Sequence, residues 1–462
     1  MNARKTEMSE QTTEATVPAT ARPASSDPRH RRLSPVVESH AWEWVDRTIW
    51  TDRMLAALAT ASSEGKSLKW HSLIDKVWRE STLQKAWQQV RKRRGAAGID
   101  GISIARFEAQ AGRYLGELAE QLKTGEYRSE PVRRVDIPKT GGGRRPLGIP
   151  AVKDRVVQTA LKSVIEPIFE SSFDASSYGF RPGRGCKDAL REVDALLKQG
   201  YTYVVDADLK SFFDSIPHDR LLARVAERIS DSKVLALIDG WLRQDIVQDL
   251  QRWTPTGGTP QGAVISPLLA NIYLHPLDAL LRARGWRMVR YADDFVVLCL
   301  SAQEAQEALA VIQQWVEANG LELNMEKTSI GNCRTRRGAF EFLGYRLTQR
   351  KREVRAKSLD KLKDTIRQRT SRIRSGTLET IIASLNRVLR GWFNYFKHAA
   401  KQTFSRLDAF VRRRIRAVLR RRTKGHGAGQ CWADGRRWPP AYFAQLGLFA
   451  MYAARVAASQ SR

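Results

Sequence analysis

Two acidic clusters in this chain have the residue types that bind divalent metal ions. Asp293 and Asp294 are neighbours in a short turn, and Asp208 lies near the end of the apolar stretch 203–209. Adjacent carboxylates repel each other and are costly to bury unless a cation compensates them. Oxygen ligands of this kind suit Mg²⁺, and two such ions about 4 Å apart support an in-line displacement at phosphorus. The three acids therefore indicate metal-dependent phosphoryl transfer.

Neither acidic cluster is sufficient on its own to predict a metal site. An Asp-Asp turn in isolation is usually a solvated turn, because aspartate favours turns for local reasons. A strand-end Asp208 facing the turn changes that interpretation, since it supplies a third oxygen donor at the same site. Phosphoryl transfer depends on positioning and charge neutralisation, so it requires no cysteine or serine nucleophile.

The elements that must position these acids alternate irregularly between strands and helices. Residues 287–291 and 295–300 are short apolar strands around the acidic turn, which predicts a tight hairpin. An amphipathic helix is expected over 301–319, with Ser301 and Glu304 as a capping box. The same reasoning predicts strands at 132–137, 203–209, 321–330 and 340–347, and helices at 156–169, 221–241 and 357–422. This order predicts an α+β fold with a palm-like sheet.

The charge of the chain is large and uneven. The 462 residues carry a formal net charge of +29, and the length is enough for two or three domains. From Cys333 to the end there are 32 Lys and Arg against 7 Asp and Glu. A generally solubilising surface would spread this charge more evenly, so the pattern favours a polyanionic partner, with nucleic acid as the default.

Other features of the composition exclude several classes of protein. The four cysteines are far apart and form no CxxC pair, which speaks against a zinc ribbon or a disulfide framework. No apolar run reaches membrane-spanning length, and the N-terminus has no secretory segment. Residues 1–36 are rich in Ser, Thr, Pro and Ala without periodicity, which predicts a disordered tail.

Short motifs follow one another along the chain. They are RPLGIP at 145–150, SYGFRPG at 177–183, DLKSFFD at 208–214, GTPQG at 258–262, YADD at 291–294, FLGY at 342–345 and LRGWFNYF at 389–396. Their order resembles that of reverse transcriptases encoded by group II introns, of the bacterial type, and the resemblance covers roughly residues 75–450. The resemblance implies a right-hand polymerase fold, with fingers and palm, followed by an α-helical thumb and maturase domain.

The resemblance also implies roles for the acids. Asp208, Asp293 and Asp294 would be the catalytic, metal-binding carboxylates, and Leu209 would offer a backbone carbonyl to a metal. Two Mg²⁺ ions are the implied cofactors, with Mn²⁺ as a substitute. Asp206 is interpreted as a structural or supporting group, since the family has its ligand at the position of Asp208.

Four further residues match the family's nucleotide-binding positions. Lys139 and Arg145 would lie over the triphosphate, although either could be a solvated surface charge. Gln261 would lie along the incoming nucleotide, or form a loop hydrogen bond. Phe213 matches the family's sugar-discriminating aromatic. A ring below the 2′ position would clash with the 2′-hydroxyl of a ribonucleotide. Core packing is the competing role of Phe213.

The basic final third matches the thumb and the intron-binding segment. Arg412, Arg413, Arg416 and Arg420 are expected to bind RNA, while apolar residues between them pack one face of the same helix. The aromatic cluster 392–396 is expected to be mainly core, with base stacking as the alternative. No His/Asn/His endonuclease with cysteine pairs is recognisable, so we expect that domain to be absent.

The predicted organisation is a tail at 1–36, fingers and palm at 37–355, thumb and maturase domain at 356–455 and a tail at 456–462. The leading hypothesis is an RNA-directed DNA polymerase that also assists splicing and retromobility of its intron. Its partners would be group II intron RNA, an RNA template, a DNA primer, deoxynucleoside triphosphates and target DNA, in a bacterial cytoplasm near the nucleoid. A splicing factor with a dispensable polymerase, and a domesticated enzyme of repair, defence or CRISPR adaptation, are the alternatives.

Overall fold

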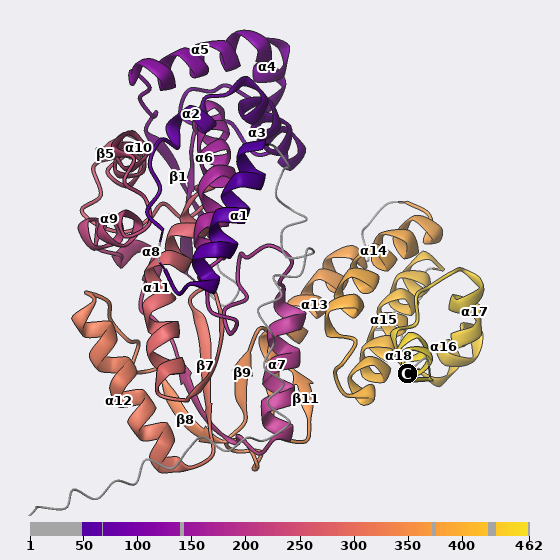
Figure 1. The fold of residues 1–462 in the computed structure, drawn as a ribbon. Helices are drawn as coiled ribbons and strands as arrows, with labels where there is room; N and C mark the ends of the chain where they lie inside the picture. The colour runs from indigo at the N-terminus through magenta and orange to yellow at the C-terminus, as the bar shows by residue number, and fades with distance from the viewer. Residues whose placement is uncertain (1–48, 67, 139–142, 372–375, 424–430, 461–462) are drawn as a thin grey trace, which may run out of the picture. The chain divides into compact units, whose positions relative to one another are not determined.

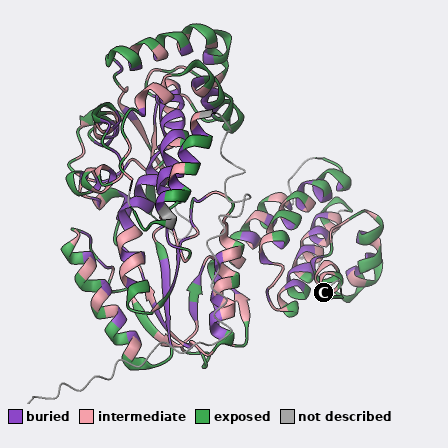
Figure 2. Ribbon diagram, in the orientation of Figure 1, coloured by how far each residue is buried: buried purple, intermediate pink, exposed green. Residues whose placement is uncertain are grey.

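The computed structural model describes residues 49–66, 68–138, 143–371, 376–423 and 431–460 (Figure 1). The predicted tail at 1–36 lies outside the described residues, and so does Lys139. The first helices are α1 (Ile49–Ser63), α2 (Ile74–Val77), α3 (Glu80–Arg93), α4 (Ile104–Ala109), α5 (Ala111–Thr124) and α6 (Val152–Glu170). The long α6 buries most of its side chains and forms the centre of this region (Figure 2).

A four-stranded sheet of order β2-β1-β4-β5 accompanies these helices. Its strands are β1 (Val132–Pro138), β2 (Arg144–Ile149), β4 (Ile246–Gln248) and β5 (Gln251–Trp253). β1 and β2 pair antiparallel, with Pro138 opposite Arg144. β1 also pairs parallel with β4, which lies more than 100 residues later in the chain. We refer to this sheet and its helices as the fingers.

The palm is a second sheet of order β6-β7-β3-β8. Its strands are β3 (Tyr203–Ala207), β6 (Arg287–Tyr291), β7 (Asp294–Cys299) and β8 (Ser329–Asn332). Helix α7 (Cys186–Lys198) packs on the face that carries Val204, Val296 and Leu298. The alternate residues Val205 and Val297 are fully buried on the other face, where α11 (Ser266–Ala283) and α12 (Ala302–Ala318) pack. The predicted α+β palm is therefore confirmed.

The structure differs from the sequence prediction at several elements. The helix expected over 221–241 is two helices, α9 (His218–Ala226) and α10 (Ser232–Leu242), because Asp231 caps the second by accepting the N–H groups of Lys233 and Val234. The strand expected over 321–330 is only the short β8, at its end.

The predicted capping box of α12 is present in a shifted form. Ser301 accepts the N–H of Glu304, as expected. The Glu304 carboxylate, however, accepts the N–H of Leu300 at 2.8 Å, one residue before the cap.

A small three-stranded sheet of order β11-β10-β9 joins the palm to the final helices. Its strands are β9 (Phe340–Phe342), β10 (Tyr345–Leu347) and β11 (Arg352–Val354), so the stretch predicted as one strand is a hairpin. The turn at Leu343 and Gly344 uses two left-handed residues, with φ of 48° and 83°.

The described residues after β11 form helices and their connections, with no strand. Its helices are α13 (Ala356–Arg369), α14 (Leu378–Phe396), α15 (Lys401–Arg422), α16 (Trp432–Arg437), α17 (Pro440–Gln445) and α18 (Met451–Gln460). Phe393 and Phe396 are buried in its core, and Trp392 and Tyr395 pack against that core, as predicted for the aromatic cluster. The predicted domain boundary at 355/356 coincides with the start of α13, whereas the boundary at 455 falls inside α18.

No described helix combines the length and apolarity needed to cross a membrane.

Candidate active site

The acidic turn joins β6 to β7. These strands pair antiparallel with Tyr291 opposite Asp294, so Ala292 and Asp293 form the tip of the tight hairpin that the sequence predicts. Ala292 adopts the left-handed conformation, with φ of 62°. This region is costly for a residue with a side chain unless surrounding contacts hold it.

Strand register brings Asp208 to the same place. β3 pairs antiparallel with β7, with Asp206 opposite Val296 and Ala207 opposite Phe295. Continuing this register by one residue places Asp208 beside Asp294, and directly opposed residues of an antiparallel pair point to the same face. The tertiary structure therefore brings together acids that are more than 80 positions apart in the chain.

The carboxylates of this cluster influence each other's protonation. Burial raises the pKa of Asp293, and the Arg145 guanidinium opposes that rise. Burial, with repulsion from Asp293 and Asp208, raises the pKa of Asp294 to about 6. Burial, with repulsion from Asp294 and Asp208, raises the pKa of Asp206 to about 7. Asp206 is thus part of the same electrostatic cluster, which sequence reasoning had assigned only to a supporting role.

The acids nevertheless do not form a ready-made metal cage. Across the described ranges, no three His, Cys, Asp or Glu side chains are grouped as metal ligands. Asp208 instead pairs with Lys327, whose Nζ lies 3.0 Å from Asp208 Oδ2. The donor set still fits a hard cation, because oxygen ligands that repel each other are stabilised by positive charge. Asp208, Asp293 and Asp294 stay the predicted ligands of Mg²⁺.

The backbone next to Asp208 is fixed by a bridge to the loop before β8. Asn324 N–H donates to Asp208 O, and Lys210 N–H donates to Glu322 O, both at 2.8 Å. Leu209 lies between these two bonds as the bridge partner of Leu323, with its side chain buried. Its predicted metal-binding carbonyl therefore belongs to a rigid part of the backbone.

Two of the predicted nucleotide-binding residues are in direct contact. Arg145 Nε donates to Gln261 Oε1 at 2.9 Å, and the Gln261 carbonyl accepts the N–H of Gly148 at 2.6 Å. The positive charge of Arg145 also opposes the rise in the pKa of Asp293. By its hydrogen bond, Arg145 links strand β2 of the fingers to the loop that carries Gln261.

Phe213 lies in the short helix α8 (Phe212–Ser215) and is 8% exposed. It lines a cavity of about 720 Å³ together with Gln261, Gly148 and Trp253. Its carbonyl accepts the N–H of Thr259 at 2.6 Å, which ties α8 to the GTPQG loop. Both predicted roles, packing and contact with a ligand, are compatible with this position.

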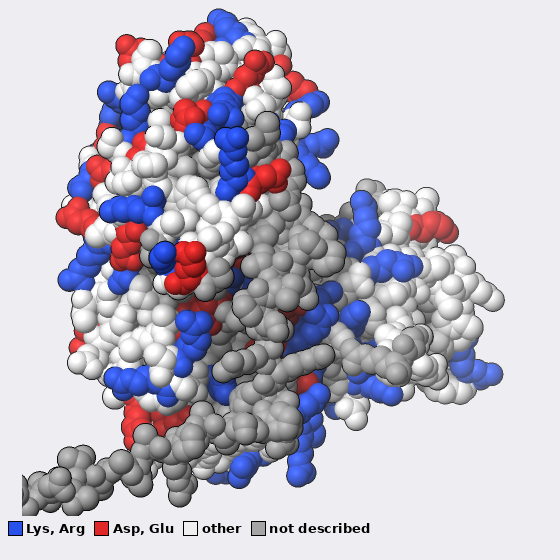
Figure 3. Space-filling model, in the orientation of Figure 1, with Lys and Arg blue, Asp and Glu red and all other residues white. Residues whose placement is uncertain are grey.

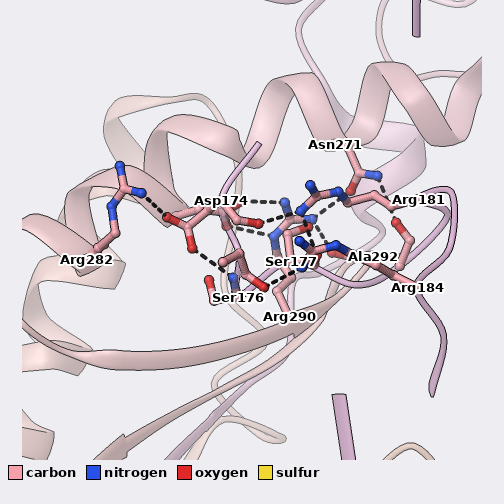
Figure 4. Close-up of polar contacts among 12 residues, drawn as sticks. Asp174, Ser176, Ser177, Arg181, Arg184, Asn271, Arg282, Arg290 and Ala292 are labelled. Carbon is pink, nitrogen blue, oxygen red and sulfur yellow. Dashed lines mark hydrogen bonds and ion pairs between the residues drawn. The ribbon is translucent and has the colours of Figure 1, made fainter. Parts of the chain in front are cut away.

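Sequence reasoning missed the buried support of the acidic turn. Arg290 is fully buried and binds both carboxylate oxygens of Asp278 on α11, at 2.7 and 2.5 Å. Its third nitrogen donates to Asn271 Oδ1 and to Ala292 O, both at 2.9 Å (Figure 4). An arginine between Val289 and Tyr291, inside a strand expected in the palm sheet, was the available signal, since a buried charge needs a partner.

The predicted RNA-binding arginines of α15 divide into two groups. Arg416 donates twice to Trp438 O, and Arg420 pairs with Asp434 at 2.7 Å, so both hold the segment that contains α16. Arg412 and Arg413 have no such bond to α16 in the described contacts, and Arg413 lies over the Phe410 ring at 5.2 Å. On the face shown in Figure 3, the helices after β11 carry basic side chains with few acidic ones.

Comparison with known proteins agrees with this arrangement. Residues 137–347 match the family profile described as reverse transcriptase (RNA-dependent DNA polymerase), and residues 359–438 match the group II intron, maturase-specific domain. Protein YkfC of Escherichia coli (strain K12) is 33% identical over 339 residues, which cover 64% of this chain and 88% of YkfC.

Two further matches cover a smaller share of this chain than the match to YkfC does. Group II intron-encoded protein LtrA of Lactococcus lactis subsp. cremoris is 37% identical over 194 residues, 42% of this chain and 32% of LtrA. A solved partial Cas6-RT-Cas1–Cas2 complex is 27% identical, with a TM-score of 0.36, and the match covers 54% of this chain and 42% of that one. From the two domain matches and the extent of the match to YkfC, this chain belongs to the group II intron reverse transcriptase/maturase family.

Proposed function

We propose that this chain copies RNA into DNA by a two-metal mechanism at the acidic turn. The observation that carries the proposal is the register of β3 and β7, which directs Asp208 to the side of Asp294. Carboxylates that raise one another's pKa are suited to hold cations. When bound there, two Mg²⁺ ions would activate the primer hydroxyl and neutralise the leaving pyrophosphate.

The chain's own residues would position the substrates. Arg145 presents a guanidinium beside Asp293 and Gln261, where it can bind the phosphates of a deoxynucleoside triphosphate. Phe213 would close the space below the sugar and reject a 2′-hydroxyl. Positioning and charge neutralisation of this kind account for most catalysis of phosphoryl transfer.

The helices after β11 would bind the intron RNA and assist its splicing. Support comes from the maturase-specific match at 359–438 and from the basic composition of this segment. Structured RNA is recognised through phosphates, 2′-hydroxyls and unstacked bases, which suits an arginine-rich helical surface. Copying of the intron RNA from a DNA primer at the target DNA would then support mobility.

Primer extension on an RNA template with Mg²⁺ and deoxynucleoside triphosphates tests the polymerase. Wild-type protein should extend the primer, and Asp293→Ala should reduce the rate by at least about 10³-fold, because a ligand of the reacting centre is lost. Asp219→Ala, an exposed acid on α9, is the matched control and should leave the rate unchanged. Full activity of Asp293→Ala would refute the site.

An assay of intron splicing at low Mg²⁺ distinguishes the proposed splicing activity from the polymerase activity. Asp293→Ala should still promote splicing, because the proposed RNA-binding surface lies on other elements. Loss of splicing in that variant, with normal RNA affinity, would show that the two activities share the acidic turn.

A further inference from the structure

The strongest unassigned feature is the buried cluster of Arg290, Asp278 and Asn271 behind the acidic turn. Arg290 is fully buried, Asp278 is 1% exposed and Asn271 is 2% exposed. A buried ion pair is weak evidence for stability alone, because removing two charges from water offsets much of their attraction. The position of this one, next to the turn that carries two metal-binding acids, indicates a more specific role.

The cluster holds the turn by its backbone. Arg290 donates to the carbonyl of Ala292, two residues later, at 2.9 Å. Ala292 is the residue with φ of 62°, and its carbonyl immediately precedes Asp293. One side chain therefore fixes the orientation of the strained peptide from which Asp293 projects.

The segment around Gly179 packs against the same turn. Asn271 Nδ2 donates to Gly179 O at 2.8 Å, and Gly179 packs so closely that a Cβ there would lie 2.1 Å from Ala292 N. The segment before Gly179 runs along β6, where Tyr178 N–H donates to Arg290 O and Arg290 N–H donates to Ser176 O. Arg181 anchors that segment by donating to Asp174 O and Ser177 O, as the bonds in Figure 4 show.

The cluster also joins the turn to the nucleotide loop. Asn271 and Asp278 both lie on α11, and α11 begins at Ser266, four residues after the GTPQG motif. Ser266 Oγ donates to Pro260 O at 2.9 Å, so the start of α11 is fixed to the loop that carries Gln261. A rigid helix thus connects the support of Asp293 to the loop of Gln261.

We infer that Arg290, Asn271 and Asp278 are positioning residues that set the placement of Asp293 and Asp294 for metal binding. None of them is expected to contact the substrate. Their loss should reduce metal affinity and the rate of the chemical step while leaving nucleotide binding largely intact. The inference rests on the proposed two-metal polymerase function.

Asn271→Ala is the decisive variant, because it removes the hydrogen bonds to Gly179 O and from Arg290 and leaves the Arg290–Asp278 pair intact. Asp278→Asn is the second variant, and Asp231→Asn is the matched control. Asp231→Asn replaces a buried carboxylate by an amide of the same shape, as Asp278→Asn does. Asp231 caps α10 and is far from the acidic turn in the chain. Melting temperature, kcat, KM for the nucleotide and the Mg²⁺ concentration at half-maximal rate are measured for each.

We expect Asn271→Ala to lower kcat by about 10- to 100-fold, since small misplacements at a reacting centre have effects of this size. KM for the nucleotide should change less than about twofold, and the Mg²⁺ requirement should rise several-fold. The Mg²⁺-induced rise in melting temperature should shrink in parallel, which is a readout independent of activity. Asp231→Asn should lower the melting temperature without changing the Mg²⁺ requirement.

The inference fails if folded Asn271→Ala keeps wild-type kcat and Mg²⁺ requirement, or if Asp231→Asn shifts the Mg²⁺ requirement equally. If Asp278→Asn does not fold, Asn271→Ala still decides the question. An inactive wild-type protein would instead refute the proposed function, so the two failures are distinguishable.

Discussion

Arg145 Nε donates a hydrogen bond of 2.9 Å to Gln261 Oε1, across 116 positions of sequence. The contact joins the fingers hairpin to the loop before α11, and both residues were predicted to bind the nucleotide. From their direct contact we predict that they act together on one ligand. Such a pair should be energetically coupled, which single substitutions cannot show.

A double-mutant cycle with Arg145→Ala and Gln261→Ala tests that coupling. Each single change should raise KM for the nucleotide, and the double change should cost less than their sum by about 0.5–1 kcal/mol, roughly two- to fivefold. Arg144→Ala, the exposed neighbour on β2, is the control and should leave KM within about twofold. Strict additivity of the free-energy changes calculated from KM would show that the two residues act on the nucleotide independently.

Lys327 is the counter-ion of Asp208, with Nζ 3.0 Å from Oδ2, and both side chains are partly exposed. Lys327→Met removes the cation that competes with Mg²⁺ for the Asp208 carboxylate. It should lower the Mg²⁺ concentration at half-maximal rate by about two- to fivefold, the range of an exposed pair. Lys210→Met, which breaks the similar exposed pair with Glu322, is the control. An unchanged or higher Mg²⁺ requirement in Lys327→Met would contradict competition between lysine and metal.

Phe213 should determine selection of the sugar. Phe213→Ala opens the cavity below the 2′ position and should reduce discrimination against ribonucleotides by roughly tenfold or more. The neighbouring Phe212 is 2% exposed, so Phe212→Ala should lower stability without changing sugar selection. Incorporation ratios for matched ribo- and deoxynucleotides provide the measurement, and equal ratios in wild type and Phe213→Ala would assign Phe213 to packing alone.

The acidic cluster should make stability depend on pH in a definite direction. The pKa of Asp206 is raised from 3.8 to about 7, first by burial, so the folded chain binds more protons than the unfolded chain between those values. Stability should therefore be highest at low pH in this window and fall as pH rises through about 7. Asp206→Asn should remove on the order of 2 kcal/mol of that pH dependence.

Urea unfolding in EDTA at several pH values between 5 and 8 measures this effect. Adding Mg²⁺ at pH 8 should restore stability in wild type, because the cation offsets the carboxylate repulsion. A free energy of unfolding that rises steadily from pH 5 to pH 8 in EDTA would contradict the assigned shift.

The arginines of α15 should separate into structural and RNA-binding residues. Arg416→Ala should lower the free energy of unfolding by about 1 kcal/mol through loss of its bonds to Trp438 O. Arg412→Ala and Arg413→Ala should weaken intron RNA binding and reduce its salt dependence, with little change in stability. Filter binding across a salt series, combined with thermal melting, distinguishes these outcomes; weaker RNA binding only in Arg416→Ala would reverse the assignment.

Several features were determined by the sequence alone. The acidic turn, the apolar strand before Asp208 and the motif order depend on neighbouring residues, so periodicity and turn chemistry were enough to predict them. The α+β class followed from the same local patterns. Lys139 lies outside the described residues, and its predicted role stays a prediction.

Only the tertiary structure decided which distant groups become partners. Lys327 lies 119 positions from Asp208, and Arg290 is buried against α11, so no local pattern specifies either contact. The same holds for Arg416, which the sequence predicts to bind RNA and whose guanidinium donates to Trp438 O, directly after α16. Local sequence sets backbone preference and which face is apolar, whereas buried charges find their partners through packing of elements far apart in the chain.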